Sequence, residues 1–190
     1  AAPAFAQDAD ALARQLSNPI ASLTSVPMQF NWDTGLGPDD DGGRVTLNVQ
    51  PVIPMSIGED WNLISRTIVP IVNQWDVVPG QGDQFGLGDT VQSLFFSPKA
   101  LTAGGWTWGV GPVFLLPTAT DDFLGTEKWG AGPTAVALRQ TASGWSYGLL
   151  FNHIWSFAGS DDRQDVNATF LQPFVSKSLG QGRTLSFGIE

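Results

Sequence analysis

The chain has 190 residues, 14% of them charged, with 18 acidic and 9 basic side chains and no cysteine. This length allows one domain, or at most two small ones, with a sizeable core. The net charge of −9 argues against nucleic acid as a partner, and the lack of cysteine excludes disulfides and thiolate metal sites. No run of 18 apolar residues occurs, which excludes a transmembrane helix within these residues.

Both ends of the sequence look cut. Residues 1–6 (AAPAFA) contain the small-x-small pattern Ala4-Phe5-Ala6, which predicts a signal-peptide remnant, with an alanine-rich leader as the alternative. Residues 184–190 stop inside an alternating run with no turn after it. We therefore expect a signal remnant over 1–6, an N-terminal periplasmic segment over 7–25, and a barrel domain over 26–190 that is truncated at its C-terminal end.

The composition of Asp8–Leu16 predicts a short helix, after which the hydrophobic period changes to two. Nine strand candidates follow, starting near Val26 and Val45 and continuing over 61–73, 85–97, 106–117, 129–140, 145–156, 166–177 and 184–190. Those that are not cut short have about 8–13 residues, whereas globular strands have about 5–6 and bilayer-spanning strands about 9–11. The strand lengths favour a membrane β-barrel.

The predicted connections alternate between short turns and long acidic loops. The short ones are 56–60, 141–144 and 178–182, with 98–105 somewhat longer. The long ones are 35–43, 74–84, 118–128 and 157–165, and they hold 11 of the 18 acidic residues. Outer-membrane barrels have short periplasmic turns and longer extracellular loops. A soluble up-and-down barrel could alternate its turns too, but it would not need to gather its acids at one end.

Tryptophans cluster at the two ends of the predicted strands. Trp61, Trp106, Trp108 and Trp145 follow short turns, Trp32, Trp129 and Trp155 adjoin long loops, and Trp75 falls inside a loop. Membrane interfaces select two such aromatic belts. Tryptophan in a sandwich core is the alternative, but core rings should favour the middle of a strand.

Polar side chains share the inward parity of their strands and predict a polar lumen. They are Gln29, Asn31 and Asp33; Thr46, Asn48 and Gln50; Asn62 and Arg66; and Ser146 and Asn152. A charge facing the bilayer midplane costs about 2–4 kcal/mol, so Arg66 should point inward, paired with Asp33 or Asp89. Such a pair would either narrow a pore or fill a closed barrel, and the sequence leaves both open.

Prolines at 51, 54, 70, 112, 133 and 173 lie within predicted strands. Each removes a hydrogen-bond donor and predicts a bulge or a locally broken ladder.

Enzymatic and cofactor-binding patterns find little support. His153 is the only histidine, and its parity, shared with Trp145 and Trp155, points it toward lipid rather than toward a nucleophile. The triplet 39–41 (DDD) lacks a full Ca²⁺-binding loop, so a solvated loop is favoured over a cation site. The Gly-x-Gly patterns lie inside strands and precede no helix, which argues against a phosphate site. We expect no catalytic residues, no metal and no cofactor.

Several motifs resemble a known bacterial family. They are residues 16–23 (LSNPIASL), 26–31 (VPMQFN), 61–67 (WNLISRT), 86–90 (GLGDT), 96–99 (FSPK), 111–119 (GPVFLLPTA) and 130–134 (GAGPT). In this order they are similar to the outer-membrane family labelled MetA-pathway of phenol degradation, whose members also carry the labels transporter and neuromedin U. The resemblance spans residues 12–190. It implies a Gram-negative outer-membrane β-barrel that passes small, including aromatic, molecules, and it supplies no binding residues.

The sequence thus predicts an all-β fold: an antiparallel transmembrane β-barrel with a short N-terminal helix. At least nine strands are present, and twelve are expected when the barrel is complete because bacterial barrels usually have even strand numbers. The expected function is passive, non-enzymatic transport of small hydrophobic or aromatic molecules across the outer membrane. The alternative is a closed structural or surface-binding barrel that acts through its acidic loops. Expected partners are outer-membrane lipid and a small solute, and the oligomeric state stays open.

Overall fold

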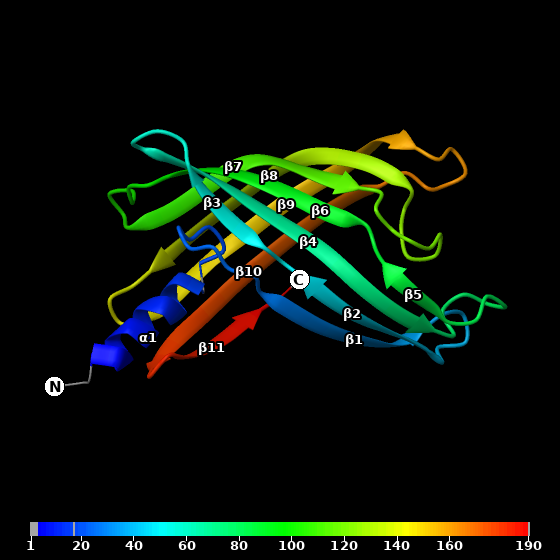
Figure 1. Cartoon of the computed structure of the whole chain (residues 1–190), viewed down its shortest axis with the longest axis horizontal. Helices are drawn as coiled ribbons and strands as arrows, with labels where there is room; N and C mark the ends of the chain where they lie inside the picture. The colour runs from blue at the N-terminus through cyan, green and yellow to red at the C-terminus, as the bar shows by residue number, and fades with distance from the viewer. Residues whose placement is uncertain (1–3, 17, 190) are drawn as a thin grey trace.

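The computed structural model describes residues 4–16 and 18–189. One antiparallel sheet curls into a half-barrel, with a helix lying at one end (Figure 1). The elements are α1 (Ala4–Leu16), β1 (Met28–Leu36), β2 (Gly42–Val49), β3 (Val52–Ser56), β4 (Trp61–Trp75), β5 (Gln84–Leu87), β6 (Thr90–Pro98), β7 (Trp106–Leu116), β8 (Lys128–Gln140), β9 (Trp145–Gly159), β10 (Asn167–Gly180) and β11 (Arg183–Gly188). The predicted all-β antiparallel fold is confirmed. Within the described residues, no helix is both long and apolar enough to cross a membrane.

The 11 strands occupy nine positions in the sheet, in the order β1-β2-β4-β6-β7-β8-β9-β10-β11. β2 and β3 pair with successive parts of β4, as two pieces of one long strand interrupted at Pro51. β5 and β6 pair with the opposite edge of β4 in the same way, and their interruption lies at Gly88-Asp89. The nine predicted strands therefore correspond to nine positions, of which two are split.

Some predicted boundaries are wrong. The helix begins at Ala4 rather than at Asp8. β4 extends to Trp75 and β5 starts at Gln84, so the predicted loop 74–84 is shorter and Trp75 belongs to a strand. Gln74 and Gln84 are cross-strand partners on these two strands, which is why the chain stays extended beyond the predicted ends.

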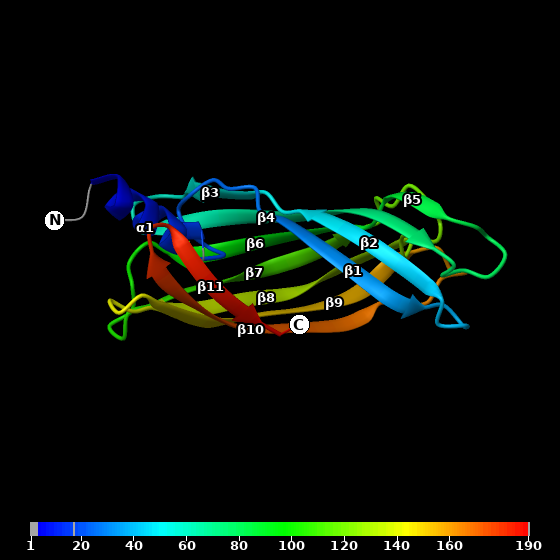
Figure 2. The ribbon, with the colours of Figure 1, turned by 90° about the horizontal axis from the view of Figure 1, so that it is seen from below.

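The sheet has an inner and an outer face of different character. Ile64, Phe95, Leu138 and Leu150 point inward and are almost completely buried. Large apolar side chains that stay exposed alternate with such positions; on the strands they include Met28, Phe30, Trp32, Ile53, Met55, Phe85, Phe96, Val110, Leu149 and Leu171. Exposed apolar surface of this extent marks a membrane or protein contact surface. Figure 2 shows β6 to β10 lying side by side in one curved layer.

Prolines at the centre of the sheet face one another across β7 and β8. Pro112 pairs in register with Pro133, and because neither has an N–H, their nitrogens must point away from each other, toward β6 and β9. The pairing is interrupted on those sides. No register partner joins β6 to β7 between Ser93 and Phe96, and β8 and β9 lack pairing at Gly132 and Pro133 among the described residues. The predicted broken ladders are confirmed at these two prolines.

Each of these prolines follows a glycine that a neighbouring carbonyl approaches closely. A Cβ on Gly111 would lie 1.9 Å from the oxygen of Leu94, and one on Gly132 would lie 1.8 Å from the oxygen of His153. Because these two positions are glycine, the backbone of β6 can approach β7 closely, and that of β9 can approach β8, at the places where the hydrogen bonds between the strands are missing.

We predict that Gly111→Ala destabilises the sheet by about 1–3 kcal/mol, because the added methyl group forces β6 away from β7. The urea midpoint of unfolding from lipid vesicles measures the effect. Gly188→Ala is the control, because its Cβ would meet Pro173 at an ordinary 3.7 Å. Equal midpoints for the two variants would contradict the close-approach argument.

Candidate functional site

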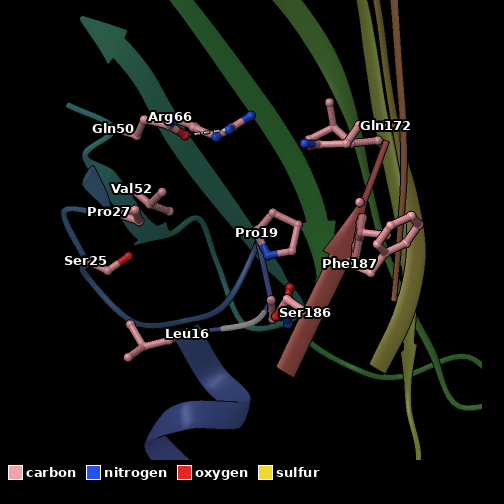
Figure 3. Close-up of a pocket in the computed structure, with 14 residues that line it drawn as sticks. Leu16, Pro19, Ser25, Pro27, Gln50, Val52, Arg66, Gln172, Ser186 and Phe187 are labelled. Atoms are coloured by element: carbon pink, nitrogen blue, oxygen red, sulfur yellow. Dashed lines mark hydrogen bonds between the residues drawn. The ribbon is translucent and has the colours of Figure 1, made fainter. Parts of the chain in front are cut away.

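Three cavities lie along the inside of the half-barrel. The first, about 300 Å³, is at the short-turn end between the segment after α1, β4, β10 and β11 (Figure 3). The second, about 370 Å³, lies between β1, β2, β4, β6, β9 and β10. The third, about 390 Å³, is at the loop end and is partly lined by the loop that precedes β8. Gln50, Arg66 and Gln172 line both the first and the second cavity.

The structure brings most of the predicted lumen residues together inside the sheet. Gln29, Asn48, Gln50, Arg66 and Asn152 line the second cavity, and Thr46 and Asp89 line the third. Asn62 donates a hydrogen bond to Ser22 at the short-turn end, at 3.2 Å. Asp33 lies further along β1, in register with Arg44.

Gln172 and Phe174 are lining residues that the sequence did not identify. Their segment, Thr169–Phe174, has no clear alternation of polar and apolar residues, so its faces could not be assigned. The register with β9 assigns them: Gln172 pairs with Leu150 and Phe174 with Gly148, both on the inner face. The known parity of β9 is the signal that could have found them.

A chain of amide side chains extends from Arg66 across three strands. Arg66 Nη2 donates to Gln50 Oε1 at 2.7 Å, and Gln50 Nε2 donates to Gln29 Oε1 at 2.9 Å. Gln29 Nε2 then donates to Asn31 Oδ1 at 3.1 Å. Every bond in the chain donates in the same direction, away from Arg66, so the amide dipoles are aligned and can strengthen one another.

A second chain of the same kind begins at Arg44, nearer the loop end. Arg44 Nε donates to Gln74 Oε1 at 2.9 Å, and Gln74 Nε2 donates to Gln84 Oε1 at 2.7 Å. Gln74 and Gln84 are buried, and the amide of Gln84 continues to loop carbonyls at 81 and 82. Both inward-facing arginines thus have a glutamine as a hydrogen-bond partner, Gln74 on β4 for Arg44 and Gln50 between β2 and β3 for Arg66.

The predicted pairing of Arg66 with Asp33 or Asp89 is wrong. Among the described residues, neither carboxylate forms an ion pair with Arg66. Asp33 lies too far toward the loop end, opposite Arg44. Asp89 is engaged by a loop: its Oδ2 accepts from the backbone N–H and Oγ1 of Thr126, at 2.6 and 2.7 Å, and its Oδ1 accepts from the N–H of Ala119.

The loop between β7 and β8 folds over the loop end of the cavities. Besides the three bonds to Asp89, Thr120 exchanges hydrogen bonds with Leu87 on β5. Phe123, Leu124 and Thr126 then line the third cavity. Asp89 interrupts the strand formed by β5 and β6, so the break in the sheet is also the anchor of this loop.

Apolar clusters narrow the interior on either side of the polar middle. Ile20, from the segment after α1, is 3% exposed and packs with Val52, Ile64 and Phe95 at the short-turn end. Val113, Leu115 and Ile154 form a second cluster toward the loop end. Polar side chains thus line the centre of the interior between these clusters, and a second polar group around Arg44 and Gln74 lies nearer the loop end.

The tryptophans predicted to form belts lie on the outer face. Trp61, Trp106 and Trp145 are exposed at the short-turn end, where Trp61 forms an edge-to-face contact with Trp108. Trp32, Trp129 and Trp155 are exposed near the loops. Their membrane role stays a prediction.

His153 also faces outward. Its Nδ1 lies 2.7 Å from Thr169 Oγ1, and its ring packs against Trp155. Its Nε2 is buried and has no hydrogen-bond partner within residues 4–16 and 18–189. A histidine that activates a hydroxyl needs a group that orients its second nitrogen, and this arrangement lacks one there.

The charges are unevenly distributed between the two ends. The four long connections lie together at one end, opposite α1 and the short turns (Figure 1). They include two ion pairs between loops: Lys128–Asp165 at 3.0 Å and Arg163–Glu127 at 2.6 Å. In the described part of the chain, no three His, Cys, Asp or Glu side chains are arranged to hold a metal ion.

The family model described as "Putative MetA-pathway of phenol degradation" matches residues 33–190. The chain belongs to this family. Comparisons with curated proteins and with solved structures found no match. Membership in the phenol-degradation family confirms the resemblance, and the half-barrel agrees with the membrane β-barrel that the family suggests.

We predict that Asp89→Asn loosens the 118–127 loop by about 1–3 kcal/mol, because an amide has one acceptor oxygen in place of two charged ones. Chymotrypsin should then cleave after Phe123 roughly tenfold or more faster, since cleavage requires local opening. The exposed Asp83→Asn is the control with the same charge change. Equal cleavage rates for the two variants would contradict the anchoring role.

The contact between Asp165 and Lys128 should depend on pH. Hydrogen bonds from Lys128 and Ser156 hold the pKa of Asp165 below its usual value of 3.8. The contact therefore adds to stability above pH 3.8 and is lost as the pH falls through the lowered pKa of the folded state. Carboxyl NMR titration should show the pKa of Asp165 rising in Lys128→Met, whereas Lys99→Met should leave it unchanged. An unchanged pKa in Lys128→Met would refute this cause.

Proposed function

We propose that this protein acts in an outer-membrane β-barrel of a Gram-negative bacterium that passes small, including hydrophobic or aromatic, molecules by passive diffusion. The observation that carries the proposal is the series of three cavities inside the sheet, with a polar centre between apolar clusters. A route for molecules that carry both a ring and a polar group needs apolar and polar lining. Apolar side chains contact the ring, and polar side chains replace the water that hydrogen-bonds to the polar group.

The outer face supports a membrane location. Its strand positions carry exposed apolar side chains, and tryptophans lie near both ends. The strands β4, β7, β8, β9 and β10 have 11–15 residues, enough to cross a bilayer when tilted. Acidic loops at one end and short turns at the other match the arrangement of outer-membrane barrels.

The proposed function is non-enzymatic. The outward position of His153 and the lack of an orienting partner for its Nε2 support this, because a general base must hold its second nitrogen in place. Thr169, its hydrogen-bond neighbour, borders the second cavity, but His153 itself lines none of the three cavities. If an activity existed there, His153→Ala would abolish it, and we expect no such loss.

A closed barrel that acts through its acidic loops is the second candidate. The apolar cluster of Val113, Leu115 and Ile154 favours it, because packed side chains at that level narrow the interior. Conductance decides between the two candidates: a closed barrel gives no channel events, and its function would be lost when the acidic loops are removed.

We predict that the purified protein forms channels in planar lipid bilayers and that Ile20→Ala increases their conductance. Ile20 is buried among Val52, Ile64 and Phe95, and removing its side chain costs about 2–5 kcal/mol, which loosens the segment that covers the short-turn end. Val26→Ala, which trims an exposed side chain of the same segment, is the control. A lack of channel events and of solute flux into liposomes would refute the pore.

A further inference from the structure

A narrow apolar groove follows β8 on the outer face of the sheet. It has a volume of about 230 Å³, and the small side chains of Ala135 and Ala137 line it. Larger side chains on the neighbouring strands β7 and β9 form its walls: Trp108, Val110, Leu149 and Phe151. Each alanine lies in register between two of these larger side chains, so the groove runs along the strand.

Arg139 lies at the short-turn end of this groove. It is two residues from Ala137 on β8 and therefore on the same face of the sheet. It pairs in register with Trp106 on one side and Tyr147 on the other, and these two rings form an edge-to-face contact at 5.8 Å. Arg139 is exposed, and no carboxylate of the described residues forms an ion pair with it. The apolar groove thus ends at a cation with two aromatic rings beside it.

We propose that Arg139 and this groove form a binding site for an anionic phospholipid, with the phosphate at Arg139 and an acyl chain along Ala137 and Ala135. The inference rests on the membrane location in the proposed function and not on transport. The strand rises by about 13 Å from Arg139 to Ala135. One leaflet of the hydrocarbon core is about 15 Å thick. An acyl chain fits this length, whereas a soluble phosphate compound would leave the apolar groove empty.

The charge around Arg139 on the outer face favours an anionic headgroup. Residues 129–160 contain no Asp or Glu, and the acids of the short-turn end lie on α1 and between β3 and β4. A second cation, Lys177, pairs in register with Trp145, and its Nζ lies 5.1 Å from the ring centroid. The same Nζ donates to the carbonyl of Ser143 at 2.6 Å. Neither partner is negative, so Lys177 adds to a positive potential that attracts anionic lipid and repels the choline of a zwitterionic one.

The tryptophans near the loops have no such arrangement. Trp32, Trp129 and Trp155 have only uncharged residues in register with them. The basic residues Lys128 and Arg163, at this end, form ion pairs with acidic residues. The lipid site therefore belongs to the short-turn end, which is periplasmic in the proposed orientation.

Native mass spectrometry of the detergent-solubilised protein tests the site, with phosphatidylglycerol and phosphatidylcholine of the same acyl chains as matched probes. We expect one phosphatidylglycerol to bind about fivefold more tightly than phosphatidylcholine, roughly the factor that one basic residue contributes near anionic lipid. Arg139→Gln should remove this preference. Ala137→Leu should weaken the binding of both lipids severalfold, because the larger side chain fills the groove.

Lys99→Gln and Ala158→Leu are the matched controls. Lys99 lies at the same end, but its Nζ donates to Ser56 Oγ and to the carbonyl of Gly58, away from the groove, so the preference should persist without its charge. Ala158 is exposed near the loops, in register with Trp129, so a leucine there should leave lipid binding unchanged. Heat-modifiability on gels verifies that each variant is folded.

Equal affinities for the two lipids, an unchanged preference in folded Arg139→Gln, or unchanged binding in folded Ala137→Leu overturns the proposal. Loss of the preference in Lys99→Gln as well would show a general effect of surface charge and also overturns it. Displacement of the lipid by glycerol phosphate, which has no acyl chain, would assign the site to a soluble phosphate compound instead. Channel activity without bound lipid refutes this site alone, whereas lipid binding without channel activity refutes the pore and keeps the site.

Discussion

The two-residue alternation of a sheet with unlike faces governs the rest of this structure. Successive side chains point to opposite faces, so once Met28, Phe30 and Trp32 are exposed on the outside, Gln29, Asn31 and Asp33 must point inward. The cross-strand register then fixes the facing of the neighbouring strands. Shifting a single strand by one residue would place Arg66 on the apolar outer face, at a cost of about 2–4 kcal/mol in a bilayer. The interior is therefore a consequence of register as much as of composition.

Much of this arrangement could be predicted because alternation is a local property. Strand positions, inward parity and the gathering of acids at one end all follow from residues that are close in sequence. The partner of Arg66 could not be found in this way. Electrostatic reasoning favours a carboxylate, but the partner is Gln50, which lies between β2 and β3 at the break made by Pro51. Only the register across β4 shows that the amide is within reach and that Asp89 is held by a loop.

The breaks in the sheet illustrate the same limit. A proline shows that a donor is missing, but not on which side of the strand it is missing. The in-register pair of Pro112 and Pro133 directs both gaps outward, to β6 and β9, and the preceding glycines let the neighbouring carbonyls approach. At Gly88-Asp89 the break between β5 and β6 has a different role. The carboxylate of Asp89 accepts hydrogen bonds from Thr126 and so anchors the loop before β8. Breaks that look alike in the sequence therefore have different structural roles, and these roles depend on which strands pair at the break.

Charge adds a direction to this interior. Eleven of the 18 acids lie in the long loops. The end that carries α1 and the short turns has five basic residues, Arg14, Lys99, Arg139, Lys177 and Arg183, and four acidic ones, Asp8, Asp10, Glu59 and Asp60. An anion that approaches from the loops meets repulsion until it is more than about 8 Å away from them, the screening length at physiological salt. At the short-turn end the acidic and basic residues nearly balance, so an anion that approaches there meets little repulsion. The two ends of the interior therefore differ in potential, and this difference opposes the entry of an anion through the loops more than its entry from the short-turn end.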